Sequence, residues 1–457
     1  MELTPLTELN IIVIHEEKGG VNLIAALIVF ATTYILMLAL PKIRHFIALG
    51  SAACFVLMGV IGIFDYTPLE ALSEIDFNVL LMIGGTMGIV ILFIESRFPI
   101  RMAEILITHV PNVKWAVAVL SLFAGVISAF VDNVATVLMV APVGLAISRK
   151  LKISPIPVII SIAVSSNLQG AATLVGDTTS ILLGGYADMN FFEFFWMKGK
   201  PGIFWGVELG ALASLLVLLF IFRKDNTPTS TKVETEVNDY VPAFLLIAVI
   251  LGLICASFIP EPQSGFALTL YQMRSGLICL VLCIAGMIYS CCRQHSSNPL
   301  KLAAKEFDTD TLLLLAGLFV VIGGVKNAGV IDAIADLFYR LAGNNPFLLY
   351  TLVVFASVVL SAFIDNIPYV ATMLPVIAGI ASRMNVEPYV FFFGLLTGAT
   401  LGGNLTPIGA SANIAAIGIL RKNGEDVTTS DFLRIGVPFT LAAVVTGYAF
   451  IWLVWGI

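Results

Sequence analysis

Charged residues are scarce in this sequence. Only 12% of its 457 residues are charged, about half of the roughly 25% usual in soluble globular proteins. The mean hydropathy is +0.99, and the apolar residues form long runs such as 21–40, 79–94 and 207–222. Each run is near the roughly 20 residues that a helix needs to cross hydrocarbon. The sequence therefore excludes a soluble domain and predicts an all-α polytopic membrane protein.

Motifs of common enzymes and pumps are also missing. The 4 histidines lie in predicted loops, and none of the 6 cysteines has metal-ligand spacing with histidine. The chain has neither a phosphate-binding GxxxxGK[ST] pattern nor an HExxH pattern. Its apolar runs are solid, without the alternation typical of barrel strands. We expect no enzyme activity, no ATP-driven pump, no nucleic-acid partner and no membrane β-barrel.

The most informative feature that is present is an internal repeat. The segment Ser128-Ala-Phe-Val-Asp-Asn-Val-Ala-Thr-Val137 returns 233 positions later as Ser361-Ala-Phe-Ile-Asp-Asn-Ile-Pro-Tyr-Val370. The same offset matches Pro142 with Pro375, and Gly170, Thr173 and Gly176 with Gly403, Thr406 and Gly409. Ionisable side chains at bilayer depth are costly and are usually kept for function. Two matched copies indicate a transporter whose binding site is built from two related halves.

The repeat and the apolar runs together predict the organisation of the chain. We expect about ten crossing helices plus two re-entrant helical hairpins, with these parts: an external N-terminal segment at 1–20; repeat 1 at 21–222, with a hairpin at 115–148 and a broken helix at 155–187; a polar cytoplasmic linker at 223–240; and repeat 2 at 241–457, with a hairpin at 346–382 and a broken helix at 387–419. Each repeat then has five crossings. Because five is odd, repeat 2 is predicted to lie upside down relative to repeat 1.

Lysine and arginine set the orientation. Most of the 24 basic residues fall on one predicted side, including Lys42, Arg97 and Lys150, and the positive-inside rule makes that side cytoplasmic. Both termini are then external, the first hairpin opens to the cytoplasm and the second opens outward. Segment 115–131 is about 25 Å long as a helix, so the sequence leaves open whether the hairpins turn back midway or span the membrane.

The hairpin tips are the first candidate binding element. Tip 1 is Asp132-Asn133 and tip 2 is Asp365-Asn366. Carboxylate and amide oxygens suit hard cations such as Na⁺, and a desolvated carboxylate can exchange a proton for a metal ion near neutral pH. The competing interpretation is a pair of Asp-Asn turns at the membrane surface, since both residues favour turns.

The broken helices are the second candidate element. Break 1 is Asn167–Thr179 and break 2 is Gly402–Asn413, and both combine glycine with polar residues. Unwound backbone and half-helix ends can bind ions or polar substrate, whereas the competing interpretation is a kinked helix that uses glycine for close packing. Neither the tips nor the breaks contain Lys or Arg, which favours a cation over a bare anion. The candidate ligands in the breaks are Asn167, Thr173, Gly176, Asp177, Thr178, Gly403, Asn404, Thr406, Gly409, Ser411 and Asn413.

These motifs resemble the ion transporter superfamily. The likeness is greatest to its arsenite-permease and NhaD-type sodium/proton antiporter branch, which includes the P-protein type, and it rests on four segments: SAFVDNVATVLMVAPV, NLQGAATLVGDTT, SAFIDNIPYVATMLPV and LGGNLTPIGASAN. The resemblance covers nearly the whole chain. It implies a dicarboxylate/citrate-transporter-like fold with inverted repeats, re-entrant hairpins, an elevator-like movement and a homodimer. The dicarboxylate branch carries Ser-Asn-Thr at its tips, where this chain has Asp132-Asn133-Val134 and Asp365-Asn366-Ile367. That departure favours the sodium/proton type.

The sequence thus predicts a multi-pass secondary active transporter of the cell membrane. Our leading hypothesis is Na⁺/H⁺ antiport, with Asp132 and Asp365 as the exchange carboxylates, Asn133 and Asn366 as further Na⁺ ligands, and Asp177 in support. No cofactor is expected apart from bound Na⁺. The expected partners are membrane lipid, a small inorganic ion or small organic anion, and a second copy of the chain. The sequence leaves open efflux of arsenite or antimonite, Na⁺-coupled transport of citrate or a dicarboxylate, and, from another class, an ion channel.

Overall fold

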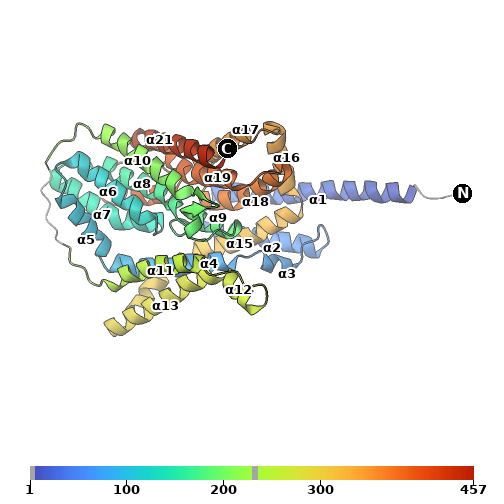
Figure 1. The fold of residues 1–457 in the computed structure, drawn as a ribbon, viewed down its shortest axis with the longest axis horizontal. Helices are drawn as coiled ribbons and strands as arrows, with labels where there is room; N and C mark the ends of the chain where they lie inside the picture. Colours follow the sequence, from blue (N-terminus) through green and yellow to red (C-terminus); the bar gives the residue numbers. More distant parts are fainter. Residues whose placement is uncertain (1–5, 229–234, 457) are drawn as a thin grey trace. The chain divides into compact units, whose positions relative to one another are not determined.

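The computed structural model describes residues 6–228 and 235–456, and this chain is almost entirely helical (Figure 1). One short antiparallel pair, β1 (Trp196–Met197) and β2 (Lys200–Pro201), forms the single sheet of the described chain. Helices suit a membrane because they satisfy their own backbone polar groups where water is absent. The predicted all-α polytopic fold is confirmed. Residues 1–5 of the predicted N-terminal segment and 229–234 of the predicted linker lie outside the described chain.

The helices of the first half end before the predicted linker, and those of the second half follow it. The first half contains α1 (Leu6–Ala39), η1 (Pro41–Ile43), α2 (Arg44–Val60), α3 (Pro68–Ser73), α4 (Phe77–Glu95), α5 (Phe98–Thr108), α6 (Val113–Ser128), α7 (Asn133–Leu151), α8 (Pro155–Gln169), η2 (Gly170–Ala172), α9 (Thr178–Tyr186), η3 (Phe192–Phe194) and α10 (Ile203–Ile221). The second half contains α11 (Val241–Ser257), α12 (Phe266–Gln272), α13 (Arg274–Gln294), α14 (Asn298–Glu306), α15 (Thr309–Asn327), α16 (Val330–Ala342), α17 (Pro346–Ser361), α18 (Asn366–Met384), α19 (Tyr389–Gly402), η4 (Gly403–Leu405), α20 (Ser411–Lys422) and α21 (Thr429–Trp455).

Ten helices of the described chain are long and apolar enough to cross a membrane. They include α7 and α18, the second arms of the two hairpins, which have 19 residues each. The first arms, α6 and α17, have 16 residues each. The total equals the predicted number of crossings, but its members differ: the prediction counts the hairpins separately, and α11 and the first half of the second broken helix are shorter apolar helices. Whether the hairpins turn back within the membrane stays a prediction.

The element order of repeat 1 returns in repeat 2. In both repeats a hairpin is followed by a helix that stops, makes one 3-10 turn and resumes after an irregular stretch. The first such helix runs through α8, η2 and α9, and the second through α19, η4 and α20. The predicted discontinuous helices at 155–187 and 387–419 are therefore confirmed.

The chain divides by its internal contacts into two compact units. The first comprises the described chain up to Asp76, Asp308–Asn344 and Pro375–Val386, and the second comprises the remaining described residues. The boundary within α18 falls at Pro375, which cannot donate a helical hydrogen bond. Both tips and both breaks belong to the second unit.

The first unit is built on α2 packed against α15. Gly317 of α15 permits this contact, because a Cβ there would lie 2.8 Å from the carbonyl carbon of Ala48. The Tyr66 hydroxyl donates to the Val320 carbonyl oxygen at 2.8 Å. These interactions join residues that are more than 250 positions apart in the chain.

The second unit contains the equivalent contact, with α13 packed against α4. A Cβ on Gly85 would lie 2.5 Å from the carbonyl carbon of Cys279. Gly85 and Gly317 are 232 positions apart and Ala48 and Cys279 are 231 apart, close to the offset of 233, so the two contacts are equivalent. In each contact, the helix that carries the glycine packs against a helix of the other repeat. Such reciprocal packing of equivalent helices is expected of a duplicated fold.

The first halves of the broken helices form the core of the second unit. Every residue from Val158 to Gln169 in α8, and from Val390 to Gly402 in α19, is buried. Helix α8 packs on α6, α7, α10, α20 and α21, and α6, α7 and α8 lie side by side in Figure 1. A helix that is apolar all round is expected to be buried. This arrangement places both breaks inside the protein.

Candidate functional site

Tip 1 begins the second arm of its hairpin. The Asp132 carboxylate accepts hydrogen bonds from the backbone N–H groups of Val134 and Ala135, at 3.0 and 3.1 Å, and so caps α7. The amide of Asn133 instead points into the protein, where its Nδ2 donates to Oδ1 of Asn167 at 2.9 Å. Asn133 is buried and Asp132 is partly buried. The Asp-Asn pair therefore makes a helix-capping turn, as a surface turn would, and also contacts break 1.

Tip 2 has the same capping geometry. The Asp365 carboxylate accepts from the backbone N–H of Ile367 at 3.1 Å. The Ser361 hydroxyl donates to Oδ1 of Asn366, and a Cβ on Gly403 would lie 3.2 Å from that same oxygen. Asn366 therefore lies against break 2 as Asn133 lies against break 1.

A threonine in each break fastens it to its own tip. The hydroxyl of Thr173 donates to the carbonyl oxygen of Ala129, and that of Thr406 donates to the carbonyl oxygen of Ala362 at 2.5 Å. These donors and acceptors correspond at the offset of 233. Two independent segments of sequence have thus folded into the same local contact.

A glycine in each break lets the backbone approach the tip closely. A Cβ on Gly176 would lie 2.7 Å from the Ala129 carbonyl oxygen, and one on Gly409 would lie 2.9 Å from that of Ala362. Real Cβ atoms essentially never come this close to backbone. Glycine at both positions is therefore required by packing.

The ends of the breaks are held in matching ways. The Ser180 hydroxyl donates to the Gly170 carbonyl oxygen at 3.2 Å, and Nδ2 of Asn413 donates to that of Gly403 at 3.1 Å. Thr178 is the first residue of α9 and Ser411 the first of α20. Between the 3-10 turns and these helices the backbone leaves the helical hydrogen-bond ladder.

Carboxamides join the two breaks. Nδ2 of Asn167 donates to the Thr400 carbonyl oxygen at 2.7 Å and to Oδ1 of Asn404 at 3.1 Å. Nδ2 of Asn404 donates in turn to the Val164 carbonyl oxygen at 2.8 Å. With Asn133 this makes a continuous chain of three amides from tip 1 through break 1 to break 2. All three amides are predicted site residues that the fold brings together.

Two contributors were absent from the predicted site. The hydroxyls of Thr179 and Thr400 lie 3.2 Å apart, and Thr179 also donates to Oδ2 of Asp177 at 2.8 Å. Thr400 corresponds to Asn167 at the repeat offset, and this correspondence could have identified Thr400 as a site residue from the sequence. Thr179 lies in the GDTT segment of break 1, directly after two predicted ligands.

The tips and breaks contain three aspartates and no Lys or Arg. Asp177 is buried and interacts electrostatically with Asp132 and, more weakly, with Asp365. Within the described chain, however, no three His, Cys, Asp or Glu side chains lie close enough to share one metal ion. The carboxylates thus interact electrostatically but lie too far apart to share one metal ion. The side chains around the breaks are neutral amides and hydroxyls.

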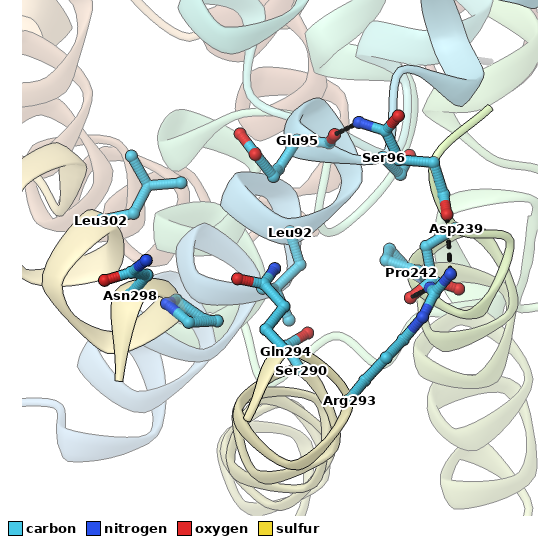
Figure 2. A pocket seen from close by; sticks show the side chains of 12 residues that line it. Leu92, Glu95, Ser96, Asp239, Pro242, Ser290, Arg293, Gln294, Asn298 and Leu302 are labelled. Carbon is cyan, nitrogen blue, oxygen red and sulfur yellow. Dashed lines mark hydrogen bonds and ion pairs between the residues drawn. The ribbon is translucent and has the colours of Figure 1, made fainter. Parts of the chain in front are cut away.

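A separate cavity of about 630 Å³ lies at the ends of α4, α13 and α14, beside the start of α11. Figure 2 shows that Arg293 reaches across it to Asp239, with which it forms an ion pair. Arg293 also donates to the Asn238 carbonyl oxygen at 2.8 Å, and Asn238 donates to that of Glu95 at 3.1 Å. None of the predicted site residues lines this cavity. Its polar groups fasten the end of the linker to two helices.

Comparison with known proteins agrees with this architecture. The sequence matches the family model described as Citrate transporter over residues 25–297 and 266–456. The chain belongs to the citrate transporter family. The predicted resemblance to ion transporters with a citrate-transporter-like fold is thereby confirmed, and the protein is a multi-span membrane transporter.

Individual relatives of this citrate transporter family member extend the comparison. An uncharacterized transporter of Mycobacterium tuberculosis is 31% identical over 438 residues, covering 94% of this chain and 98% of that protein. The P protein of Mus musculus is 25% identical over 473 residues, covering 88% of this chain and 56% of its own length. The YdaH transporter of Alcanivorax borkumensis has a similar fold, with a TM-score of 0.58 and 12% identity over 90% of this chain and 96% of that chain.

Proposed function

We propose that this transporter is driven by an ion gradient and exchanges Na⁺ for H⁺. The observation that carries the proposal is the set of three acidic side chains, Asp132, Asp177 and Asp365, beside tips and breaks that contain no Lys or Arg. Asp132 and Asp365 would each lose a proton when Na⁺ binds and regain it when Na⁺ leaves. Asn133, Asn366 and the freed carbonyl groups of the breaks would supply neutral oxygen ligands.

The proposed movement is elevator-like alternating access. All candidate ligands lie in the second compact unit, and the tip-to-break hydrogen bonds make them one connected assembly. Such an assembly can travel with its ion bound, because moving it need not break those contacts. We further propose that the repeats are inverted, that both termini are external and that the transporter works as a homodimer in the cell membrane.

Purified transporter in proteoliposomes tests the exchange directly. An outward Na⁺ gradient should drive proton uptake, reported by a trapped pH-sensitive dye. Asp132→Asn and Asp365→Asn should each abolish that uptake, because asparagine keeps the shape of the side chain but cannot exchange a proton. If both variants still move protons in response to Na⁺, the assigned roles are wrong.

Transport of citrate or a related organic anion is the second candidate. The match to the citrate transporter family favours it. Without Lys or Arg in the tips and breaks, such an anion would bind together with a cation or at a helix N-terminus. Counterflow of labelled citrate, with and without Na⁺ or a divalent cation, separates this candidate from antiport.

Oxyanion efflux and channel conduction can be tested with the same purified transporter. Arsenite or antimonite efflux would appear as accumulation of the oxyanion in inside-out vesicles, without a need for Na⁺. An ion channel would give ohmic single-channel currents and no saturable counterflow. Saturable Na⁺ counterflow without such currents supports the proposed carrier.

A further inference from the structure

A cluster of buried polar groups in repeat 1 takes no part in the hydrogen bonds between tip and break. Gln169, the last residue of α8, is fully buried, and its Oε1 and Nε2 have no hydrogen-bond partner in the described chain. The hydroxyls of Ser121 and Ser128 on α6 are equally buried and equally without a partner there. Three neutral side chains thus present four unsatisfied polar atoms inside the protein.

These side chains lie along one face of α6, where it packs on α8. The Gln169 amide lies against Gly125, because a Cβ there would be 2.4 Å from Cδ of Gln169. Ser121 precedes Gly125 by one helical turn and Ser128 follows it by about one turn, so all three share a face. Ser128 ends α6, and Asp132 of tip 1 follows four residues later. The polar row therefore leads to tip 1.

Repeat 2 fills the same place with apolar side chains. Gly125 and Gln169 correspond to Val358 and Gly402, and a Cβ on Gly402 would lie 2.6 Å from Cα of Val358. In repeat 1 the glycine, Gly125, is on α6 and the larger side chain, Gln169, is on α8. In repeat 2 the glycine is on α19, and the larger side chain is on α17 and is apolar. The fold therefore needs no amide at this contact.

The two serines show the same asymmetry. Ser121 corresponds to Val354 in repeat 2. Ser128 corresponds to Ser361, whose hydroxyl bonds to Asn366 and lies 2.5 Å from the Ala399 carbonyl oxygen. Asp177 of break 1, similarly, corresponds to Ala410. At these positions repeat 1 is thus the more polar half, although repeat 2 has buried hydroxyls elsewhere, at Ser357 and Thr397.

Water is the ligand that suits this row. Buried polar groups are normally satisfied by protein or by ordered water, and a buried water makes two to four hydrogen bonds. Amide and hydroxyl groups both donate and accept, as a row of water molecules requires. The row itself is uncharged: α6 and α8 carry one charged residue, Lys114 in the first turn of α6, and α10, which packs on α6, carries Glu208. A hard metal ion would call for carboxylates here.

We propose that Ser121, Gln169 and Ser128 hold a row of internal water molecules that carries protons to Asp132 and has no counterpart at tip 2. Each water would accept one proton and release another to the next, so no covalent bond changes on balance. The inference rests on the proposed proton-coupled function and makes it more specific. It gives the proton of Asp132 a water path of its own, although the two tips share the same sequence motif.

Hydration of the row can be tested without any transport assay. In transporter whose six native cysteines are replaced, Ser121→Cys is compared with Val354→Cys, its counterpart in repeat 2. Ag⁺ ions can follow narrow water-filled paths and bind thiolate. We expect Ag⁺ to protect Ser121→Cys from later alkylation in denaturant and to leave Val354→Cys unprotected. Equal behaviour of the two cysteines would overturn the proposed water row.

The role in proton movement is tested by giving repeat 1 the pair found in repeat 2. The double variant Gly125→Val with Gln169→Gly should lose most Na⁺-driven proton movement and should retain exchange of radioactive Na⁺ for Na⁺. Ser121→Ala should lower Na⁺-driven proton movement, and its matched control Val354→Ala should leave both activities unchanged. Unchanged proton movement in a folded double variant contradicts the inference.

Folding of each variant is checked by its thermal unfolding in detergent. If the double variant does not fold, Gln169→Leu together with Ser121→Val decides the question in the same assays. If the unaltered transporter shows no Na⁺-dependent proton movement, the proposed antiport fails. In that case the Ag⁺ experiment still decides whether the row holds water.

Discussion

Amides, more than carboxylates, connect the candidate site at the scale of single residues. Asn133, Asn167 and Asn404 form one hydrogen-bonded chain inside the protein. Asp132 and Asp365 use carboxylate oxygens to cap the helices that follow them. A carboxylate at a helix N-terminus is stabilised by free N–H groups and by the helix dipole. The acidic groups are thus held in place by their own helices before any ion binds.

Replacing Asn167 should be the most damaging single change among these amides. Asn167→Leu leaves Asn133, Asn404 and the Thr400 carbonyl without a shared partner, and each buried group left unsatisfied costs about 1–3 kcal/mol. We expect a clear fall in the temperature of unfolding and loss of transport. Asn226→Ala, at an exposed position, is the control and should unfold like the unaltered protein. Equal unfolding of the two variants would show that the amide chain contributes little.

The capping box of α3 predicts a local dependence on acid. Hydrogen bonds from the backbone N–H and hydroxyl of Thr67 hold the pKa of Glu70 below its usual value. The ionised form is therefore favoured in the folded state. Its contribution is complete above the ordinary pKa of about 4.3 and is lost as pH falls through the lower folded-state pKa. Protection of the α3 amides from hydrogen exchange, corrected for the intrinsic pH dependence of exchange, should fall over that interval, and Glu70→Gln should remove this pH-dependent fall.

The two broken helices matter most at the scale of secondary-structure elements. Each has a glycine whose missing side chain makes room for the carbonyl groups of its hairpin. Because the hairpin end and the break touch through backbone, their relative position is fixed more firmly than flexible side chains could fix it. Each break is therefore held rigidly against its tip. This rigidity favours an ion-binding role for the breaks over the competing interpretation of a kinked helix.

Alanine at these glycines should separate hairpin from break. Gly176→Ala and Gly409→Ala each force a methyl group against backbone, and overpacking of this kind costs about 1–3 kcal/mol. We expect lower thermal stability and loss of substrate-dependent stabilisation in both. Gly418→Ala in α20 meets nothing within 4 Å and should be neutral or slightly stabilising, because alanine favours helix by about 1 kcal/mol. A similar loss in all three variants would contradict the packing argument.

At the scale of the whole molecule, the same element order occurs twice, and one helix contact in each compact unit has its equivalent in the other. The contact of α2 with α15 has its equivalent in α13 with α4. Such mirrored use of helices from both halves is expected when two repeats fold together. The inverted orientation of those repeats remains a prediction from charge and the count of crossings.

Thiol labelling in intact cells tests that orientation. Cysteine is placed at two exposed positions, Lys150 at the end of the first hairpin and Asn344 just before the second, in protein without native cysteines. An impermeant thiol reagent should label Asn344→Cys in intact cells and Lys150→Cys only after the membrane is opened. Labelling of both from outside would contradict inverted topology. A reporter fused at the C-terminus should likewise be accessible from outside.

Much of this architecture follows from composition and spacing alone. The hairpins and the breaks were predicted from long apolar runs, from the glycine and proline between them, and from one repeat offset. These features were sufficient because helix length and chain breaks depend on local sequence. The tips were placed correctly at the starts of α7 and α18. Thr179 and Thr400 were missed, since their importance comes from a contact between residues 221 positions apart.

By itself, then, the sequence determined that this protein is a helical membrane transporter with an internally repeated Asp-Asn motif. In hydrocarbon the backbone polar groups must be hydrogen-bonded within each helix. The long apolar segments that form such helices can be recognised one at a time in the sequence. Only the tertiary structure decided that Asn167 joins tip 1 to break 2 and that Gln169 lies against Gly125. Those contacts arise only when distant segments pack, so no single stretch of the sequence predicts them.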